Sequence, residues 1–261
     1  MLKALHTAAA GMAGQQFKID VTSNNLANVN TAGFKRSRAE FQDLLYQQIK
    51  APGVAGRTGS APSAGIDVGS GVKISGTERV MALGDLKQTD NPLDLAIEGD
   101  GFFQVRLPSG ALGYTRAGLL RGDGDGRLVT PDGDPLDPPV VLPRDAVAVT
   151  VARDGVVSVL VDGRTDPVEV GHVELARFVN ASALRPLGRN LFAPTTTSGE
   201  PVAVTPGQEG SGALLQGYLE TSNVQVVEEM VELIASQRAY ELNSKAIQAA
   251  DAILQRLVNL R

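Results

Sequence analysis

Hydrophobic positions in the last part of the chain repeat every seven residues without interruption by Gly or Pro. Spacing of this kind is typical of helices that pack along one another. Ser222 and Gln225 have the spacing of a capping box, which predicts that the helix starts there. One helix of about 35 residues would be about 50 Å long. The repeating positions are Val226, Leu233, Tyr240, Ile247 and Leu254.

The same helix carries a second apolar stripe beside the first. At 100° per residue, a set of mostly small side chains that includes Ala239 and Ala246 falls next to the Leu, Tyr and Ile positions. Small side chains let helices approach closely, and a broad apolar face has to be covered. We expect one stripe to pack within the chain and the other to contact neighbouring molecules.

Residues 2–28 carry the other long amphipathic pattern. Its repeating positions are Leu5, Met12, Ile19 and Leu26. Gly11 and Gly14 each weaken a helix by about 1 kcal/mol relative to Ala, so this helix needs a partner. No other long heptad pattern exists in the chain, and we therefore predict a coiled-coil-like pair between the two end helices.

Between the helices the hydrophobic period changes to two. From 72 to 204, short apolar runs alternate with Gly-rich and Asp-Gly turns, which is typical of antiparallel strands joined by hairpins. The predicted fold class is α+β, with a mainly antiparallel β domain inserted between paired long helices. We divide it into a helical core domain (1–30 with 222–261), a connecting arm (31–71 with 205–221) and the β-rich outer domain.

Composition narrows the class of function. The chain has 261 residues, a formal net charge of −5 and no Cys, which excludes disulfides and thiolate catalysis. It has no basic stripe for nucleic acid and no run of about 18 apolar residues for membrane insertion. The only two His, His6 and His172, lie in no catalytic motif. We expect no enzyme and no cofactor.

A group of acidic residues leaves one alternative open. Several carboxylates in Gly-rich turns are ligands that calcium prefers, although Asp-Gly is also a common hairpin turn. The bidentate Glu of an EF-hand is missing. The alternative function is a calcium-stabilised, β-rich surface adhesin. The acidic residues are Asp123, Asp125, Asp132, Asp134 and Asp137.

Three stretches resemble the flagellar rod and hook family. They are 23–35 (SNNLANVNTAGFK), 84–103 and 216–245, and they occur in the family's order along nearly the whole chain. Within the family, 41–53 and the chain length resemble the distal rod branch, and a proximal rod or hook subunit is the alternative. The family-motif residues are Asn24, Asn25, Leu26, Ala27, Asn28, Thr31, Gly33, Phe34, Asn91, Pro92, Gly99, Gly101 and Phe102.

This resemblance implies a structural subunit of the flagellar basal body. Its copies would stack helically into a stiff hollow shaft that carries torque and passes export substrates. The implied partners are further copies of the chain, proximal rod subunits, hook protein, P- and L-ring proteins, the rod cap and the flagellar export apparatus. The implied location spans the periplasm, reached by type III flagellar export without a cleaved signal peptide. The stretch 46–65 is implied to be absent from the hook protein.

Overall fold

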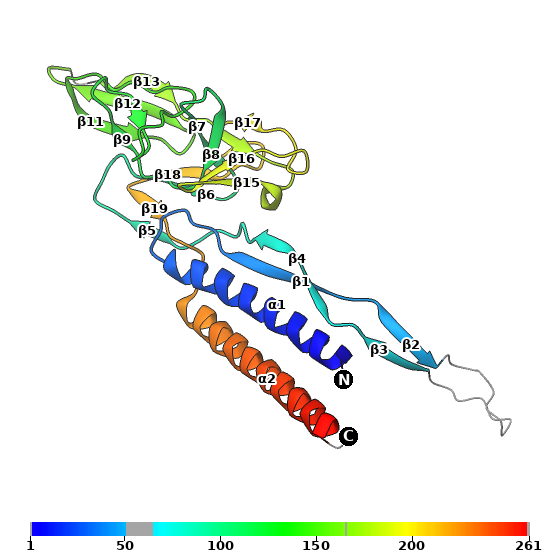
Figure 1. Ribbon diagram of the computed structural model, residues 1–261. Coiled ribbons are helices and arrows are strands. Elements are labelled where there is room, and N and C mark those ends of the chain that lie inside the picture. The colour runs from blue at the N-terminus through cyan, green and yellow to red at the C-terminus, as the bar shows by residue number, and fades with distance from the viewer. Residues whose placement is uncertain (1, 51–64, 165, 260–261) are drawn as a thin grey trace. The chain divides into compact units, whose positions relative to one another are not determined.

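The computed structural model describes residues 2–50, 65–164 and 166–259. A long helix lies at each end, α1 (Leu2–Ala27) and α2 (Val226–Asn259), with strands between them (Figure 1). The two predicted end helices are confirmed. The predicted helix start at Ser222 is wrong, because this residue precedes α2 and its hydroxyl accepts the N–H of Val224 (3.3 Å). Neither described helix combines the length and apolar character needed to cross a membrane.

The strands between the helices are short, and one 3-10 turn, η1 (Ala181–Ala183), lies among them. Their bounds are β1 (Ser37–Asp43), β2 (Tyr46–Lys50), β3 (Ile66–Gly69), β4 (Val72–Arg79), β5 (Leu86–Gln88), β6 (Leu95–Glu98), β7 (Phe102–Arg106), β8 (Leu112–Thr115), β9 (Arg121–Gly122), β10 (Leu128–Val129), β11 (Ala146–Val151), β12 (Val156–Val161), β13 (Val168–His172), β14 (Leu175–Arg177), β15 (Arg185–Gly188), β16 (Leu191–Ala193), β17 (Val202–Val204), β18 (Ala213–Gln216) and β19 (Tyr218–Glu220).

The chain forms two compact units. Unit 1 contains 1–26, 37–78 and 226–261, and unit 2 contains 27–36 and 79–225. Strands β1 to β3 and most of β4 therefore belong to the same unit as the two helices. The three-part division proposed from sequence stays a prediction, and the two units group the residues differently. Within the stretch 46–65, residues 51–64 lie outside the described residues.

Unit 2 is built from antiparallel strand pairs. Its largest sheet has the order β15-β16-β8-β7-β14-β17, and every neighbouring pair in it is antiparallel. Three further strands form the sheet β11-β12-β13, and β18 and β19 pair with β6 and β5. The predicted, mainly antiparallel β region between the helices is confirmed.

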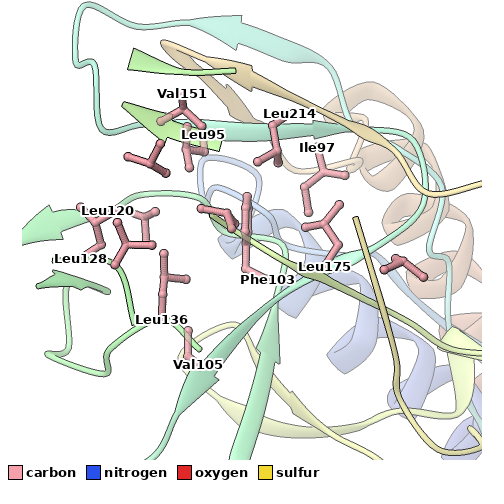
Figure 2. Packing of buried hydrophobic residues seen from close by; sticks show 14 of the residues in the cluster. Leu95, Ile97, Phe103, Val105, Leu120, Leu128, Leu136, Val151, Leu175 and Leu214 are labelled. Carbon is pink, nitrogen blue, oxygen red and sulfur yellow. The ribbon is translucent and has the colours of Figure 1, made fainter. Parts of the chain in front are cut away.

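A hydrophobic core fills unit 2. Figure 2 shows aliphatic side chains from several strands that gather around Phe103, which is fully buried. A second cluster contains Phe102, Tyr114 and Phe192. The rings of Tyr114 and Phe178 meet edge to face at 4.8 Å between centroids, a geometry worth about 0.5–1.5 kcal/mol beyond area burial. Unit 2 therefore has what an independently folded domain needs.

Unit 1 differs sharply in what it buries. Among its described residues, Ala8 is the one buried hydrophobic side chain. Four polar side chains in the same unit are buried, namely Thr22, Asn25, Glu229 and Ser236. Because apolar burial is the main stabilising term in folding, the helices of unit 1 gain little of it within a single chain.

Candidate functional site

The two helices of unit 1 run side by side in opposite directions (Figure 1). Contacts between them join successively earlier residues of α1 to successively later residues of α2. Three of these contacts involve polar residues or Gly. The contacts pair Asn25 with Glu229, Lys18 with Glu232, and Gly11 with Asn243.

A second face of α1 packs on the strands of unit 1. A Cβ at Gly14 would lie 3.3 Å from a ring carbon of Phe41 and 3.7 Å from a methyl of Val72. A Cβ at Gly71 would lie 3.4 Å from the Cβ of Ala10. The glycines that weaken α1 as an isolated helix therefore permit its close packing. In the sequence, the two glycines within an amphipathic helix are the feature that indicates this packing.

The predicted stripe of α1 lies beside its contacts with α2. Three of its residues, Met12, Ile19 and Leu26, each follow a contact residue by one position, and 100° per residue turns them toward the flank of the helix pair. All four side chains are half-buried. They are Leu5, Met12, Ile19 and Leu26.

The predicted interface residues of α2 differ in how exposed their side chains are. Tyr240 is 39% exposed and Val226 is 40% exposed, and Ala246 is exposed too. The others are half-buried. They are Leu233, Ala239, Ile247 and Leu254.

An exposed apolar face runs along α2. Val227 is 74% exposed and Leu242 is 66% exposed, although both are aliphatic. At 100° per residue, most of this face lies on the side of α2 away from Glu229 and Ser236, and Val226 and Tyr240 lie closer to those two residues. Exposed apolar patches on a helix are typical of interaction surfaces. The large exposed hydrophobic residues of α2 are Val226, Val227, Met230, Val231, Ile234, Tyr240, Leu242 and Ile253.

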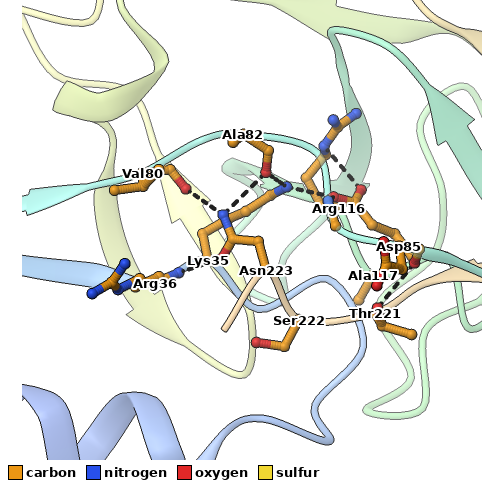
Figure 3. Close-up of polar contacts among 12 residues, drawn as sticks. Lys35, Arg36, Val80, Ala82, Asp85, Arg116, Ala117, Thr221, Ser222 and Asn223 are labelled. Atoms are coloured by element: carbon orange, nitrogen blue, oxygen red, sulfur yellow. Dashed lines mark hydrogen bonds and ion pairs between the residues drawn. The ribbon is translucent and has the colours of Figure 1, made fainter. Parts of the chain in front are cut away.

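Three buried charges meet in unit 2 (Figure 3). Glu220 accepts a hydrogen bond from Lys35 and lies 3.3 Å from Nε of Arg116. Its Oε1 also accepts the N–H of Gly84 at 3.0 Å, and Lys35 donates to the carbonyl of Ala82 at 2.7 Å. The side chains of Lys35 and Glu220 are 0% exposed, so each charge depends on these partners.

Burial sets the electrostatics of this cluster. It lowers the pKa of Lys35 and the pKa of Arg116, and the Glu220 carboxylate offsets only part of each effect. Arg116 also donates to the carbonyls of Gly101 (2.9 Å) and Gly99 (2.8 Å). The three charges are bound to one another and to backbone groups of unit 2, which is typical of a structural site.

Asn223 adds a second polar link in unit 2 (Figure 3). Its Oδ1 accepts the N–H of Arg36 at 2.8 Å, and its Nδ2 donates to the carbonyls of Val80 (2.8 Å) and Ala82 (3.1 Å). Gly33 donates its N–H to the carbonyl of Glu220 at 2.8 Å. Three segments far apart in sequence are thus tied together by backbone and side-chain hydrogen bonds.

Three family models match the chain in order. The model described as flagella basal body rod protein matches residues 5–35. The model for the flagellar hook protein FlgE/F/G D1 domain matches residues 96–159. The model for the flagellar basal body rod FlgEFG protein C-terminal region matches residues 215–260.

Similar proteins cover the chain over its full length. A flagellar basal-body rod protein FlgG of Buchnera aphidicola subsp. Acyrthosiphon pisum (strain APS) is 47% identical over 100% of both chains. One of Caulobacter vibrioides is also 47% identical over 100% of both, and one of Bacillus subtilis (strain 168) is 40% identical over 100% of both. The chain belongs to the flagellar basal-body rod protein family. A flagellar hook protein FlgE of Helicobacter mustelae is similar over 51% of the chain and 30% of its own length, at 41% identity.

The first rod-family motif runs from the end of α1 into unit 2. Thr31 donates through its hydroxyl to Oδ1 of Asn28 at 3.2 Å. Gly33 has φ of +69°, and a Cβ there would lie 2.5 Å from the N of Ala117, so only Gly fits. Phe34 is buried. Asn24 is exposed, Leu26 is half-buried and Ala27 ends α1.

The central rod-family motif builds a turn and a strand entry. Asn91 donates to Asp94 at 2.8 Å, and the carbonyl of Pro92 accepts from Gln216 at 2.8 Å. Gly99 and Gly101 have φ of +125° and +141° and present the carbonyls that Arg116 binds. Phe102 is buried in the aromatic cluster. These motif residues therefore shape the backbone of the turn and the strand.

The carboxylates in the acidic turns of this rod-family chain lie next to arginine side chains. Asp123 accepts the N–H groups of Asp125 and Arg127 at 2.8 Å each, and Arg127 also binds both side chains. The hydrogen bond from the Arg127 backbone is the main cause that lowers the pKa of Asp123. Asp132 and Asp134 lie near Arg189, at 4.0 and 3.7 Å. Across the part of the chain that the structure describes, no group of three or more acidic or His residues is arranged to hold a metal.

Proposed function

We propose that this chain is a structural subunit of the distal rod of the bacterial flagellar basal body. Copies stack helically into a stiff, hollow shaft that carries torque from the motor to the hook and lets export substrates pass. Full-length similarity to proteins named flagellar basal-body rod protein FlgG supports the proposal. In this role the chain performs no catalysis.

The difference in burial between the two units carries the proposal. Unit 2 has a complete hydrophobic core, whereas unit 1 buries one hydrophobic residue among its described residues and exposes aliphatic side chains along α2. Covering one Val, Leu or Ile side chain fully stabilises by about 1.5–3 kcal/mol. Unit 1 therefore gains its apolar burial by packing against other copies.

Two kinds of helix contact build the shaft. Within a subunit, α1 and α2 pair in a coiled-coil-like manner, flanked by the Leu5-to-Leu26 stripe. Between subunits, the Ala-containing stripe with Ala239 and Ala246 and the exposed aliphatic face of α2 contact neighbouring copies. The exposed position of Ala246 leaves it accessible for such a contact.

The other partners and the location follow from the family. The subunit meets proximal rod subunits, hook protein, the P- and L-ring proteins and the rod cap. It spans the periplasm after export by the flagellar type III apparatus, without cleavage of a signal peptide. An exported chain is threaded unfolded, and the absence of Cys removes the chance of trapping a wrong disulfide outside the cytoplasm.

Electron microscopy of the purified chain under polymerising conditions tests the proposal. We expect helical tubes from the unchanged protein and none from Ala246→Glu, which places a charge in the neighbour contact. Gln248→Glu is the control, because it adds the same charge on the same helix at an exposed position among the exposed polar residues Glu241, Lys245 and Asp251. A chain that stays monomeric, or an Ala246→Glu chain that polymerises normally, contradicts the proposal.

A further inference from the structure

Asn25 is a buried polar residue at the end of α1, where an apolar residue is expected on an inward helix face. It is 1% exposed, and so is Glu229 opposite to it on α2. We propose that Asn25 is a positioning residue that fixes the register of α2 and of β1 against α1. The inference rests on the proposed function in one respect, because that function makes α1 and α2 the helices through which copies of the chain assemble.

The amide of Asn25 is used on both of its sides. Nδ2 donates to Oε2 of Glu229 at 3.1 Å and to the carbonyl of Ser37 at 2.8 Å. Oδ1 accepts the N–H of Ser37 at 2.9 Å. One side chain therefore joins the end of α1, the first residue of β1 and the first turn of α2, all within unit 1.

The path of the chain explains the two hydrogen bonds between the Asn25 side chain and the Ser37 backbone. The chain leaves unit 1 after Leu26 and returns to it at Ser37. The paired hydrogen bonds from Asn25 close this excursion, because they hold the residue just before the exit against the residue at the return. The position of β1 along α1 is then set by hydrogen bonds whose geometry tolerates little displacement.

Apolar stripes alone do not set the register of two helices sharply. A shift by one heptad again places aliphatic residues opposite one another, whereas the hydrogen bond from Asn25 to Oε2 of Glu229 forms in one alignment only. Shifting α2 so that Ala250 faces Gly11 places Ser236 opposite Asn25. Glu229 then faces no residue of α1, since that helix ends at Ala27.

The exposed contact nearby has a different character. Lys18 Nζ lies 3.4 Å from Oε2 of Glu232, with side chains 32% and 41% exposed. Exposed ion pairs contribute little and are screened by salt. The pair of Lys18 and Glu232 therefore serves as a matched control for that of Asn25 and Glu229.

The chain has no Cys, so a pair of introduced thiols reports the register directly. A Cβ at Gly11 would lie 3.4 Å from Cγ of Asn243, about where the sulfur of an Asn243→Cys side chain sits. Gly11→Cys with Asn243→Cys therefore reports the native register, and Gly11→Cys with Ala250→Cys reports the shifted one. Equilibrating each full-length chain with glutathione gives the effective concentration of each thiol pair.

In the otherwise unchanged chain, we expect the effective concentration of the native thiol pair to exceed that of the shifted pair at least about tenfold. This factor corresponds to the free energy of a buried hydrogen bond to a charged group. Adding Asn25→Leu with Glu229→Leu should bring the two effective concentrations to within about threefold of each other. Both effective concentrations should stay above their values in urea. Adding Lys18→Leu with Glu232→Leu should leave the ratio within about twofold of its starting value.

Several results would overturn the proposal. A ratio near one in the starting chain, or one that survives the Asn25 and Glu229 changes, means that other contacts fix the register. An equal loss in the control variant removes any special role of Asn25. If both thiol pairs fall to their values in urea, Asn25 stabilises the pairing itself and does not select its register. None of these results depends on polymer formation, so they are distinguishable from failure of the proposed function.

Discussion

Replacing Glu220 by Gln tests how unit 2 holds its buried charges. Glu220 is the one carboxylate in contact with both Lys35 and Arg116 among the described residues. The change keeps the size of the side chain but leaves two buried cations facing a neutral amide. The native cluster has a net charge of +1, and the variant has +2.

The magnitude follows from the contacts. Removing one partner of a buried ion pair costs about 3–5 kcal/mol, because the remaining charge stays desolvated. Lys35→Met costs less, about 1–3 kcal/mol, because Glu220 keeps Arg116 at 3.3 Å and the N–H of Gly84 at 3.0 Å. Combining both changes restores the net charge of +1. The double variant should therefore lose about 1–3 kcal/mol less than the sum of the single changes.

Thermal unfolding of the full chain measures these costs. Near-ultraviolet circular dichroism follows the packing of Tyr114, which is buried in unit 2. For a domain of this size, Glu220→Gln should lower the melting temperature by about 6–20 °C. The three variants and the unchanged chain together form a double-mutant cycle.

Two results would refute the reasoning. A fall of less than about 2 °C for Glu220→Gln would mean that water or other groups solvate the two cations. Strictly additive losses in the cycle would mean that Lys35 and Glu220 do not depend on each other. Either result removes the cluster as the link between the chain segments of unit 2.

Three further predictions concern the glycine turn, pH and assembly. Gly33→Ala should destabilise unit 2 by about 2–4 kcal/mol, since a Cβ there combines positive φ with a backbone clash, whereas Gly122→Ala, in open space, should cost under about 1 kcal/mol in the same urea titration. Burial lowers the pKa of Lys35, so the unfolded chain binds more protons between the folded-state pKa and the ordinary lysine value. The urea midpoint should therefore rise with pH through that window, and Lys35→Met should lose this rise. The free chain should show less helix by far-ultraviolet circular dichroism than the polymer, because unit 1 lacks apolar burial alone; equal helicity contradicts this.

The sequence by itself determined where the helices and many turns lie. Heptad spacing without Gly or Pro predicts α2, and the same spacing predicts α1, because a helix repeats its faces within a few residues. Short apolar runs between Asp-Gly turns, such as Val156–Val161, predict strands from local sequence alone. The three motif stretches also carry the family resemblance without any structural information.

Only the tertiary structure decided which residues meet. Strand β15 contains Pro186 and is exposed throughout, and β18 lies in a Gly-rich stretch, so neither has a period to detect. Lys35 and Glu220 are 185 positions apart, and no local pattern links them. On the helices, contacts between α1 and α2 pass through Gly11, Lys18 and Asn25, which lie beside the predicted stripe. Periodicity reports the faces of one element, whereas pairing depends on the shape and hydrogen bonds of its partner.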